Sequence, residues 1–358
     1  MKKLSVKNFL PWLLIALLVA GCALCLLAYK NTAGLLLSQS AAERWQGENE
    51  TAFAQASCFT SAADSISEEE IYNFRMAMIT KLKEASFEVS ADTPLIHDAW
   101  CGFGQVDVAK GQRKGKVSVT AVGGSYFDFH PIKLVSGNYL YPDDLMEDRV
   151  LLDRESAWLL FGGEELSGMG FEINGQPFYV AGVIEREDDR FSERAYSGGM
   201  GIYMHYEAYK KLNENAAISC YELVMAEPVE GFVYSAVTEK FPIGTGEIVD
   251  NTYRYEPERL LKMLKGGSTR SMHLGSAVYP YWENAARGAE DSCLRLIVAA
   301  MVFAALPLVL LLWLVIRALV FGKAKLEDEY IPAAKEKIAE SWRVRARQRW
   351  EKRNPGKK

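Results

Sequence analysis

Two long runs of apolar residues lie near the two ends of the 358-residue chain. The first covers residues 9–29, interrupted only by Pro11, and the second runs from Leu296 to Ile316. Each has about 20 residues, the length that an α-helix needs to cross roughly 30 Å of hydrocarbon. A core helix of that length would carry a polar face, and neither run has one. We therefore predict two transmembrane helices, at residues 9–29 and 293–316.

Basic residues flank both runs on the sides toward the chain ends. They are Lys2, Lys3 and Lys7 before the first run, and Arg317, Lys323 and Lys325 after the second. Such flanks are typical of the cytoplasmic side of a span. We predict a multi-pass protein of the cell membrane in which residues 1–8 and 317–358 are cytoplasmic and residues 30–292 form an extracytoplasmic domain.

The first run also permits a second interpretation. The segment Val19–Cys22 fits a lipoprotein cleavage box, which would make Cys22 a lipidated N-terminus. However, the apolar run continues through Ala28, whereas polar chain normally follows a cleavage site. A membrane span is therefore the favoured interpretation, and lipidation of Cys22 stays open.

Between the spans, short strand-like runs alternate with helical stretches. Residues 54–60 are typical of a strand, and Ser67 with Glu70 forms a capping-box pattern ahead of apolar residues at helical spacing. A hairpin is predicted at 99–108 and 116–122, and a second strand–helix–strand unit at 219–226, 231–241 and 245–251. Two such units favour the α+β class, with a ferredoxin-like (porter-type) subdomain of the split βαβ kind.

A β-rich insert and a stalk complete the predicted outer domain. The insert, residues 126–212, is dense in Gly and Asp turns, with one hairpin predicted around Gly175-Gln176-Pro177. The stalk, residues 256–292, would contain a short helix, a break at 266–268 and a helix that leads into the second span.

The insert contains an ordered series of short motifs. They are Tyr126–Leu140, Val150–Asp153, Ala157–Gly162, Gly170–Gly175 and Phe178–Ile184. Their succession resembles the MacB-like periplasmic core domain of the MacB/FtsX class of ATP-binding-cassette (ABC) permeases. In that family F-x-x-x-L-x-x-G-R, V-V-L-(D/N), A-x-x-L-F-G, G-x-x-(I/V)-x-(I/V)-x-G and (Y/F)-x-V-V-G-V follow one another in the same order.

The resemblance implies an outer domain of two parts that works beside an ABC ATPase at the outer membrane surface. Two features depart from the family. Asn138 stands where the family pattern usually has Arg, and one predicted helix follows the outer domain where family permeases carry three. We therefore expect an ABC ATPase subunit and further permease subunits as partners, because the chain would not transport alone.

Charge is strongly segregated along the chain, whose formal net charge is −5. Residues 317–358 contain 13 basic and 6 acidic residues, so the tail carries +7 and the rest carries −12. An acidic outer domain argues against nucleic acid as a partner. A basic tail beside the inner leaflet suits anionic headgroups of the lipid bilayer.

Three of the six cysteines, Cys58, Cys101 and Cys220, fall in the outer domain, where disulfides are permitted. Cys58 lies on the first predicted strand and Cys101 on the next. Neighbouring strands of a split βαβ sheet would bring the two together, so we predict a Cys58–Cys101 disulfide that leaves Cys220 unpaired.

Motifs that carry catalysis or bind cofactors do not stand out. The chain has no G-x-x-x-x-G-K-(S/T) and no G-x-S-x-G, and its four histidines lack ligand spacing. Carboxylate clusters such as 185–189 fit solvated turns better than a calcium loop. We expect neither catalytic, cofactor-binding nor metal-binding residues, and the protein is not predicted to be an enzyme.

The tail contains one further pattern. Apolar residues recur every four positions from Ala334, including Ile338, Trp342 and Trp350, with Lys and Arg between them. A helix of this kind can lie on the inner membrane face or dock on a cytoplasmic ATPase. A basic tail without structure that only fixes the topology is the third possibility.

The leading hypothesis is a non-catalytic membrane subunit of an ABC-type export or extrusion complex, whose outer domain handles substrate outside the membrane. Two alternatives are a two-span sensor that binds a ligand outside and signals through partners, and a lipoprotein-type binding module. A sensor would usually carry a cytoplasmic signalling domain, and residues 317–358 are too few for one to fold readily.

Overall fold

The computed structural model describes residues 6–47, 51–60, 64–87, 95–196, 199–244, 246–266 and 279–353. The chain divides into two compact units. Residues 28–296 form the larger unit, and residues 1–27 together with 297–358 form the smaller one.

A single sheet organises the larger unit, and the described residues contribute ten strands to it. The strands are β1 Phe53–Phe59, β2 Ile96–Lys110, β3 Arg113–Gly124, β4 Lys133–Gly137, β5 Arg149–Asp153, β6 Gly170–Ile173, β7 Gln176–Glu185, β8 Gly201–His205, β9 Cys220–Ala226 and β10 Glu247–Asp250. Their order is β10-β1-β9-β2-β3-β8-β5-β7-β4, and β6 pairs with β2 and β7. This mixed architecture confirms the predicted α+β class.

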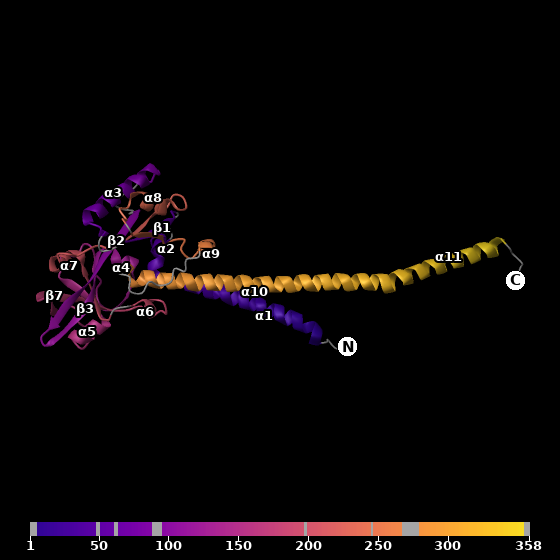
Figure 1. Cartoon of the computed structure of the whole chain (residues 1–358), viewed down its shortest axis with the longest axis horizontal. Coiled ribbons are helices and arrows are strands. Elements are labelled where there is room, and N and C mark those ends of the chain that lie inside the picture. Colours follow the sequence, from indigo (N-terminus) through magenta and orange to yellow (C-terminus); the bar gives the residue numbers. More distant parts are fainter. Residues whose placement is uncertain are drawn as a thin grey trace. The chain divides into compact units, whose positions relative to one another are not determined.

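The four strands β10-β1-β9-β2 form an antiparallel sheet that is ferredoxin-like. Helices α3 (Glu68–Glu84) and α8 (Phe232–Lys240) link β1 to β2 and β9 to β10, and they pack side by side over one face of these strands (Figure 1). The insert interrupts this ferredoxin-like part between β2 and β9.

Helix α3 shows why the first unit folds as the sequence indicates. The Ser67 hydroxyl accepts from the Glu70 backbone N–H at 3.2 Å, and the Glu70 carboxylate accepts from the Ser67 N–H at 2.8 Å. This reciprocal capping box satisfies two N–H groups that a helix N-terminus leaves open. The apolar stripe of α3, which includes Phe74 and Met78, is buried on the sheet.

The insert extends the same sheet from β3 to β4. Its helices are α4 Tyr126–Phe129, α5 Arg154–Leu160, α6 Ser192–Ala195 and α7 Tyr206–Leu212. The hairpin between β6 and β7 turns at Asn174-Gly175, with φ of 49° and 78°, because Ile173 pairs with Gln176. The predicted turn at Gly175-Gln176-Pro177 was therefore one residue late. An Asn-Gly pair with both φ positive is the favoured two-residue hairpin turn.

The larger unit also contains the 3-10 turn η1 (Leu37–Gln39), α2 (Ala41–Gln46), α9 (Pro257–Gly266) and the start of α10 (Tyr281–Lys325). Helix α2 contacts β1 and β9, and α4 contacts β2. Most of the predicted break at 266–268 lies outside the described residues, as do residues 267–278 of the predicted stalk.

The smaller unit contains most of α1 (Val6–Ala33), the rest of α10, the π-helical turn η3 (Leu326–Tyr330) and α11 (Ile331–Arg353). Within the described residues, α1 and α10 are long and apolar enough to cross a membrane. A Cβ atom added at Gly21 of α1 would lie 3.2 Å from the Phe303 ring of α10. Small residues of this kind allow helices to approach closely in a membrane.

Candidate functional site

Helix α10 begins inside the larger unit, where Arg254 fixes its first three turns. Arg254 lies in the turn after β10 and is 4% exposed. Its guanidinium donates to both oxygens of Glu283, at 2.6 and 2.8 Å, and to Glu290 at 2.5 Å. It also donates to the Gln39 side-chain oxygen at 2.9 Å. A guanidinium matches this fork geometry, which an ammonium group cannot.

Arg287 adds a second guanidinium to this network. It donates to Glu283 at 2.7 Å and to Glu247 of β10 at 2.7 Å, and it lies 4.0 Å from the centre of the Tyr279 ring. Glu283 therefore lies between two arginines with no exposed surface of its own. We call Arg254, Glu283, Arg287 and Glu290 the ionic anchor of α10.

The electrostatics of the ionic anchor follow from its burial. Burial alone would lower the pKa of Arg254, but Glu283 and Glu290 outweigh it and hold that pKa well above its ordinary value. Arg287 behaves in the same way, because Glu283 and Glu247 raise its pKa against burial. Both guanidinium groups are therefore charged at physiological pH.

An aromatic contact joins the same helix to the sheet. The Trp282 ring lies 4.4 Å from that of His130 and 5.8 Å from that of Phe103 on β2. His130 Nε2 contacts the buried Glu222 carboxylate of β9, whose other oxygen accepts from the Ser57 hydroxyl at 2.9 Å. His130 is thus a hydrogen-bonded core residue, 2% exposed.

The anchor has no nucleophile or open ligand position, because its charged groups are buried and paired with one another. These pairs hold the first turns of α10 against the rest of the larger unit. Removing one partner of a buried ion pair leaves an uncompensated charge, which costs about 3–5 kcal/mol. The base of α10 is therefore the candidate functional site.

The predicted Cys58–Cys101 pair needs correction, since both thiols are free in this structure. Strand β9 lies between β1 and β2, because a split βαβ sheet inserts a third strand between the two parallel ones. Two strand spacings amount to about 9.5 Å, beyond the roughly 7 Å that a disulfide tolerates. Cys58 also pairs in register with Tyr221 and Cys101 with Cys220, so the two thiols point to opposite faces.

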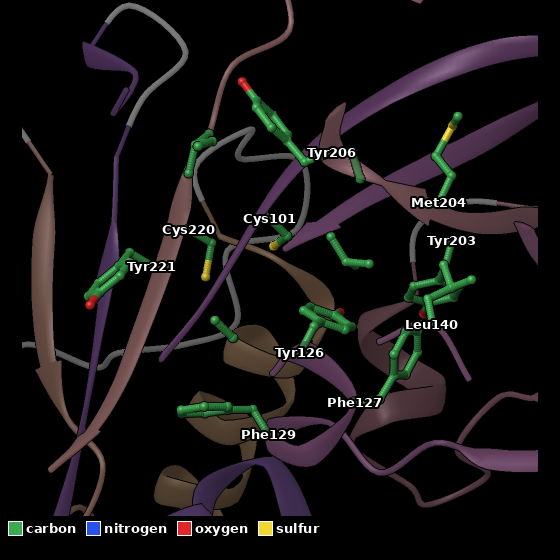
Figure 2. Close-up of a cluster of buried hydrophobic side chains, with 14 of the residues drawn as sticks. Cys101, Tyr126, Phe127, Phe129, Leu140, Tyr203, Met204, Tyr206, Cys220 and Tyr221 are labelled. Carbon is green, nitrogen blue, oxygen red and sulfur yellow. The ribbon is translucent and has the colours of Figure 1, made fainter. Parts of the chain in front are cut away.

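Cys101 and Cys220 are the two cysteines that the sheet brings together. They are opposite residues of β2 and β9, and Figure 2 shows them on neighbouring strands beside Tyr126. Their side chains are within hydrogen-bonding contact, and burial raises the pKa of both thiols. The sequence analysis placed Cys101 on the correct strand but paired it with the wrong cysteine.

The three residues predicted for the tail helix lie on α11, which spans Ile331–Arg353. Ile338, Trp342 and Trp350 are 57%, 68% and 56% exposed. A four-residue repeat advances about 40° per step around an α-helix, so the stripe winds slowly rather than following one line. Trp342 and Trp350 are then about 80° apart, which still places both on one side.

Sequence reasoning missed the ionic anchor. Its signal was available in the charged residues at positions 283, 287 and 290, which share one helix face just ahead of an apolar span. The pattern did not reveal that this face is buried, because Arg254 and Glu247 reach it from other parts of the chain.

These features define a class of protein: a membrane protein with an extracytoplasmic α+β domain, in which a ferredoxin-like sheet and a β-rich insert are attached to an apolar helix. The chain belongs to the MacB-like periplasmic core domain family, which it matches over residues 30–238, more than half of its length. This family is that of permease components of ABC transporters, which are not themselves enzymes.

The chain is also similar to two solved structures. The periplasmic region of MacB from Actinobacillus actinomycetemcomitans has 15% identity and a TM-score of 0.40, covering 60% of this chain and 94% of that one. The extracellular domain of the noncanonic ABC-type transporter YknZ from Gram-positive bacteria has 14% identity and a TM-score of 0.36, covering 51% and 88%. No curated protein sequence matches the chain.

Proposed function

We propose that this protein is a non-catalytic membrane subunit of an ABC-type export or extrusion complex, and that its outer domain handles substrate outside the membrane. Membership of a family of ABC transporter permease components supports the proposal. The energy would come from a separate ABC ATPase subunit, and further permease subunits would complete the path through the membrane.

The observation that carries the proposal is the course of helix α10. It is one helix of 45 residues, about 67 Å at 1.5 Å per residue, and roughly 30 Å of it would cross the hydrocarbon. Its first turns are held by the ionic anchor and by Trp282. We therefore expect a displacement of the membrane part of α10 to be passed to the outer domain through these contacts.

The proposed topology follows the sequence pattern. Residues 9–29 and 293–316 would cross the membrane, residues 30–292 would lie outside, and residues 1–8 and 317–358 would be cytoplasmic. Within this arrangement Ile338, Trp342 and Trp350 would lie at the inner headgroup level or against the ATPase. Their exposure on α11 leaves them available for either contact.

The test is purification of the full chain from its native membrane in mild detergent, followed by identification of partners and an ATPase assay. We expect a nucleotide-binding subunit to co-purify and its ATP hydrolysis to respond to Arg254→Ala. The matched control is Lys262→Ala, which removes an exposed pair with Glu258. Recovery of a lone chain or homodimer that still binds a ligand would replace this proposal with the sensor hypothesis.

A further inference from the structure

A cavity of about 640 Å³ opens on the face of the sheet next to the base of α10. Its size falls within the roughly 300–1,000 Å³ of small-molecule sites. The ionic anchor, the buried His130 cluster and the cysteine pair do not line it. It is a separate feature of the larger unit, with a floor, a wall and one charged end.

The floor is a grid of two rows across three strands. Phe103 of β2, Thr120 of β3 and Tyr203 of β8 are paired in register, and so are Gln105, Ser118 and Gly201. Residues two apart on a strand share a face, so both rows point into the cavity.

The other face of the same strands is packed. Val106 and Ala121, which do not line the cavity, are 3% and 0% exposed, whereas Phe103 is 37% exposed. A Phe ring left open beside a packed face is the apolar floor that a ligand could cover.

The wall comes from the start of α10. Tyr281 stacks on Tyr196 with ring centres 4.1 Å apart, and both rings line the cavity. The Tyr281 hydroxyl donates to Glu187 at 3.0 Å, and Tyr196 donates to the other oxygen of the same carboxylate. Both rings are thus held in position with their hydroxyl ends occupied, so that they offer apolar surface to the cavity.

Two charged residues at one end of the cavity, Asp153 and Arg186, neutralise each other. Asp153, 2% exposed, accepts from the Gly201 N–H at 2.6 Å and from the Ser156 N–H at 2.7 Å, and it pairs with the Arg186 guanidinium at 2.5 Å. Burying a ligand charge here would require a partner of opposite charge. The hydroxyls of Ser118 and Thr120 and the Gln105 amide are further polar groups of the floor.

We propose that this cavity binds an uncharged organic molecule that combines a flat apolar ring with hydroxyl or amide groups. The rings of Phe103, Tyr203 and Tyr281 would contact its apolar part, and the floor hydroxyls and the Gln105 amide would hydrogen-bond its polar groups. The inference deepens the proposed function and rests on it, because it names the class of substrate that the outer domain would handle. Tyr281 is the first residue of α10, so an occupied cavity would contact the helix that enters the membrane.

The test uses the full chain in lipid nanodiscs and 4-nitrophenyl β-glucoside, a neutral ring joined to hydroxyl groups. Binding is measured by equilibrium dialysis and by saturation-transfer NMR. We expect saturable binding, at least tenfold weaker binding of 4-nitrophenyl phosphate, and at least tenfold weaker glucoside binding by Thr120→Trp, which fills the floor. The matched control is Thr80→Trp on the exposed face of α3, which should bind as the wild type does.

A second variant keeps the test decisive if Thr120→Trp fails to fold, as judged by circular dichroism. Phe103→Ala removes one ring contact and should weaken binding by about threefold to tenfold. Absence of glucoside binding to the wild type, or unchanged binding by the folded cavity variants, would overturn the proposal. Glucoside binding without a co-purified ATPase would support ligand binding in the cavity but contradict the proposed export complex.

Discussion

At the residue scale, the buried guanidinium of Arg254 depends most on its ion-pair partners. Its guanidinium is taken out of water and surrounded by Glu283, Glu290 and the Gln39 side chain. Such a group stabilises the fold only while its partners are present. A buried carboxylate that loses its counter-ion destabilises the folded state far more than an exposed carboxylate does.

We therefore expect Arg254→Ala to lower the free energy of unfolding by about 3–5 kcal/mol. Denaturant titration of the full chain in detergent, followed by circular dichroism, measures this change. Lys262→Ala should leave the transition where it is, since the Lys262–Glu258 pair is exposed. A loss below about 1 kcal/mol for Arg254→Ala would mean that the anchor behaves like a surface pair.

A second prediction at this scale concerns the cysteines. Register-opposed residues of antiparallel strands have Cα atoms about 4.5–5.5 Å apart, inside the disulfide range of about 4.4–6.8 Å. On refolding with oxidised glutathione, we expect Cys101 and Cys220 to join. Two thiols would lose two protons and two electrons, and one glutathione disulfide would become two thiols.

Peptide mapping without reduction measures the outcome. A Cys101–Cys220 linked peptide with Cys58 unmodified is expected, and Cys101→Ser should abolish it. A Cys58-linked peptide from the folded protein would contradict the sheet order, because β9 separates Cys58 from Cys101.

At the scale of elements, local patterns predicted more than topology did. The capping box at Ser67 and the apolar stripe of α3 are set within one helix, so the sequence alone was sufficient for them. The hairpin of β2 and β3 was predicted shorter than it is. The prediction of a Cys58–Cys101 disulfide overlooked that β9 lies between β1 and β2. Pairing between strands that are distant in sequence leaves no local signal.

The tail helix α11 gives a prediction at this scale. Replacing both Trp342 and Trp350 by Ala should lower binding of a residue 331–353 peptide to anionic vesicles several-fold, because Trp rings favour the headgroup region. Co-sedimentation measures the bound fraction. Val344→Ala, at an exposed position of the same helix, is the control. If vesicle binding is unchanged while co-purification of the ATPase is lost, the helix docks on protein instead.

For the whole molecule, the proposed topology predicts which positions an impermeant thiol reagent can reach in intact cells. A cysteine at Leu145, which is 100% exposed in the insert, should be labelled. A cysteine at Ser341 should be labelled only after the cells are permeabilised, because the tail is proposed to be cytoplasmic. Labelling at Ser341 in sealed cells would reverse the assignment of the tail.

The insert enters and leaves the ferredoxin-like part at a single point. Cys101 and Cys220 are opposite each other, and the Ser219 N–H donates to the Cys101 carbonyl at 3.1 Å. A two-residue turn in place of residues 102–219 would therefore join β2 to β9 as an ordinary hairpin, leaving the order β10-β1-β9-β2 unchanged. During evolution, residues 102–219 could therefore be exchanged as one unit. Selection could then alter the floor of the cavity, all of which these residues supply, while the ferredoxin-like part keeps Arg254 and Glu247, which pair with α10.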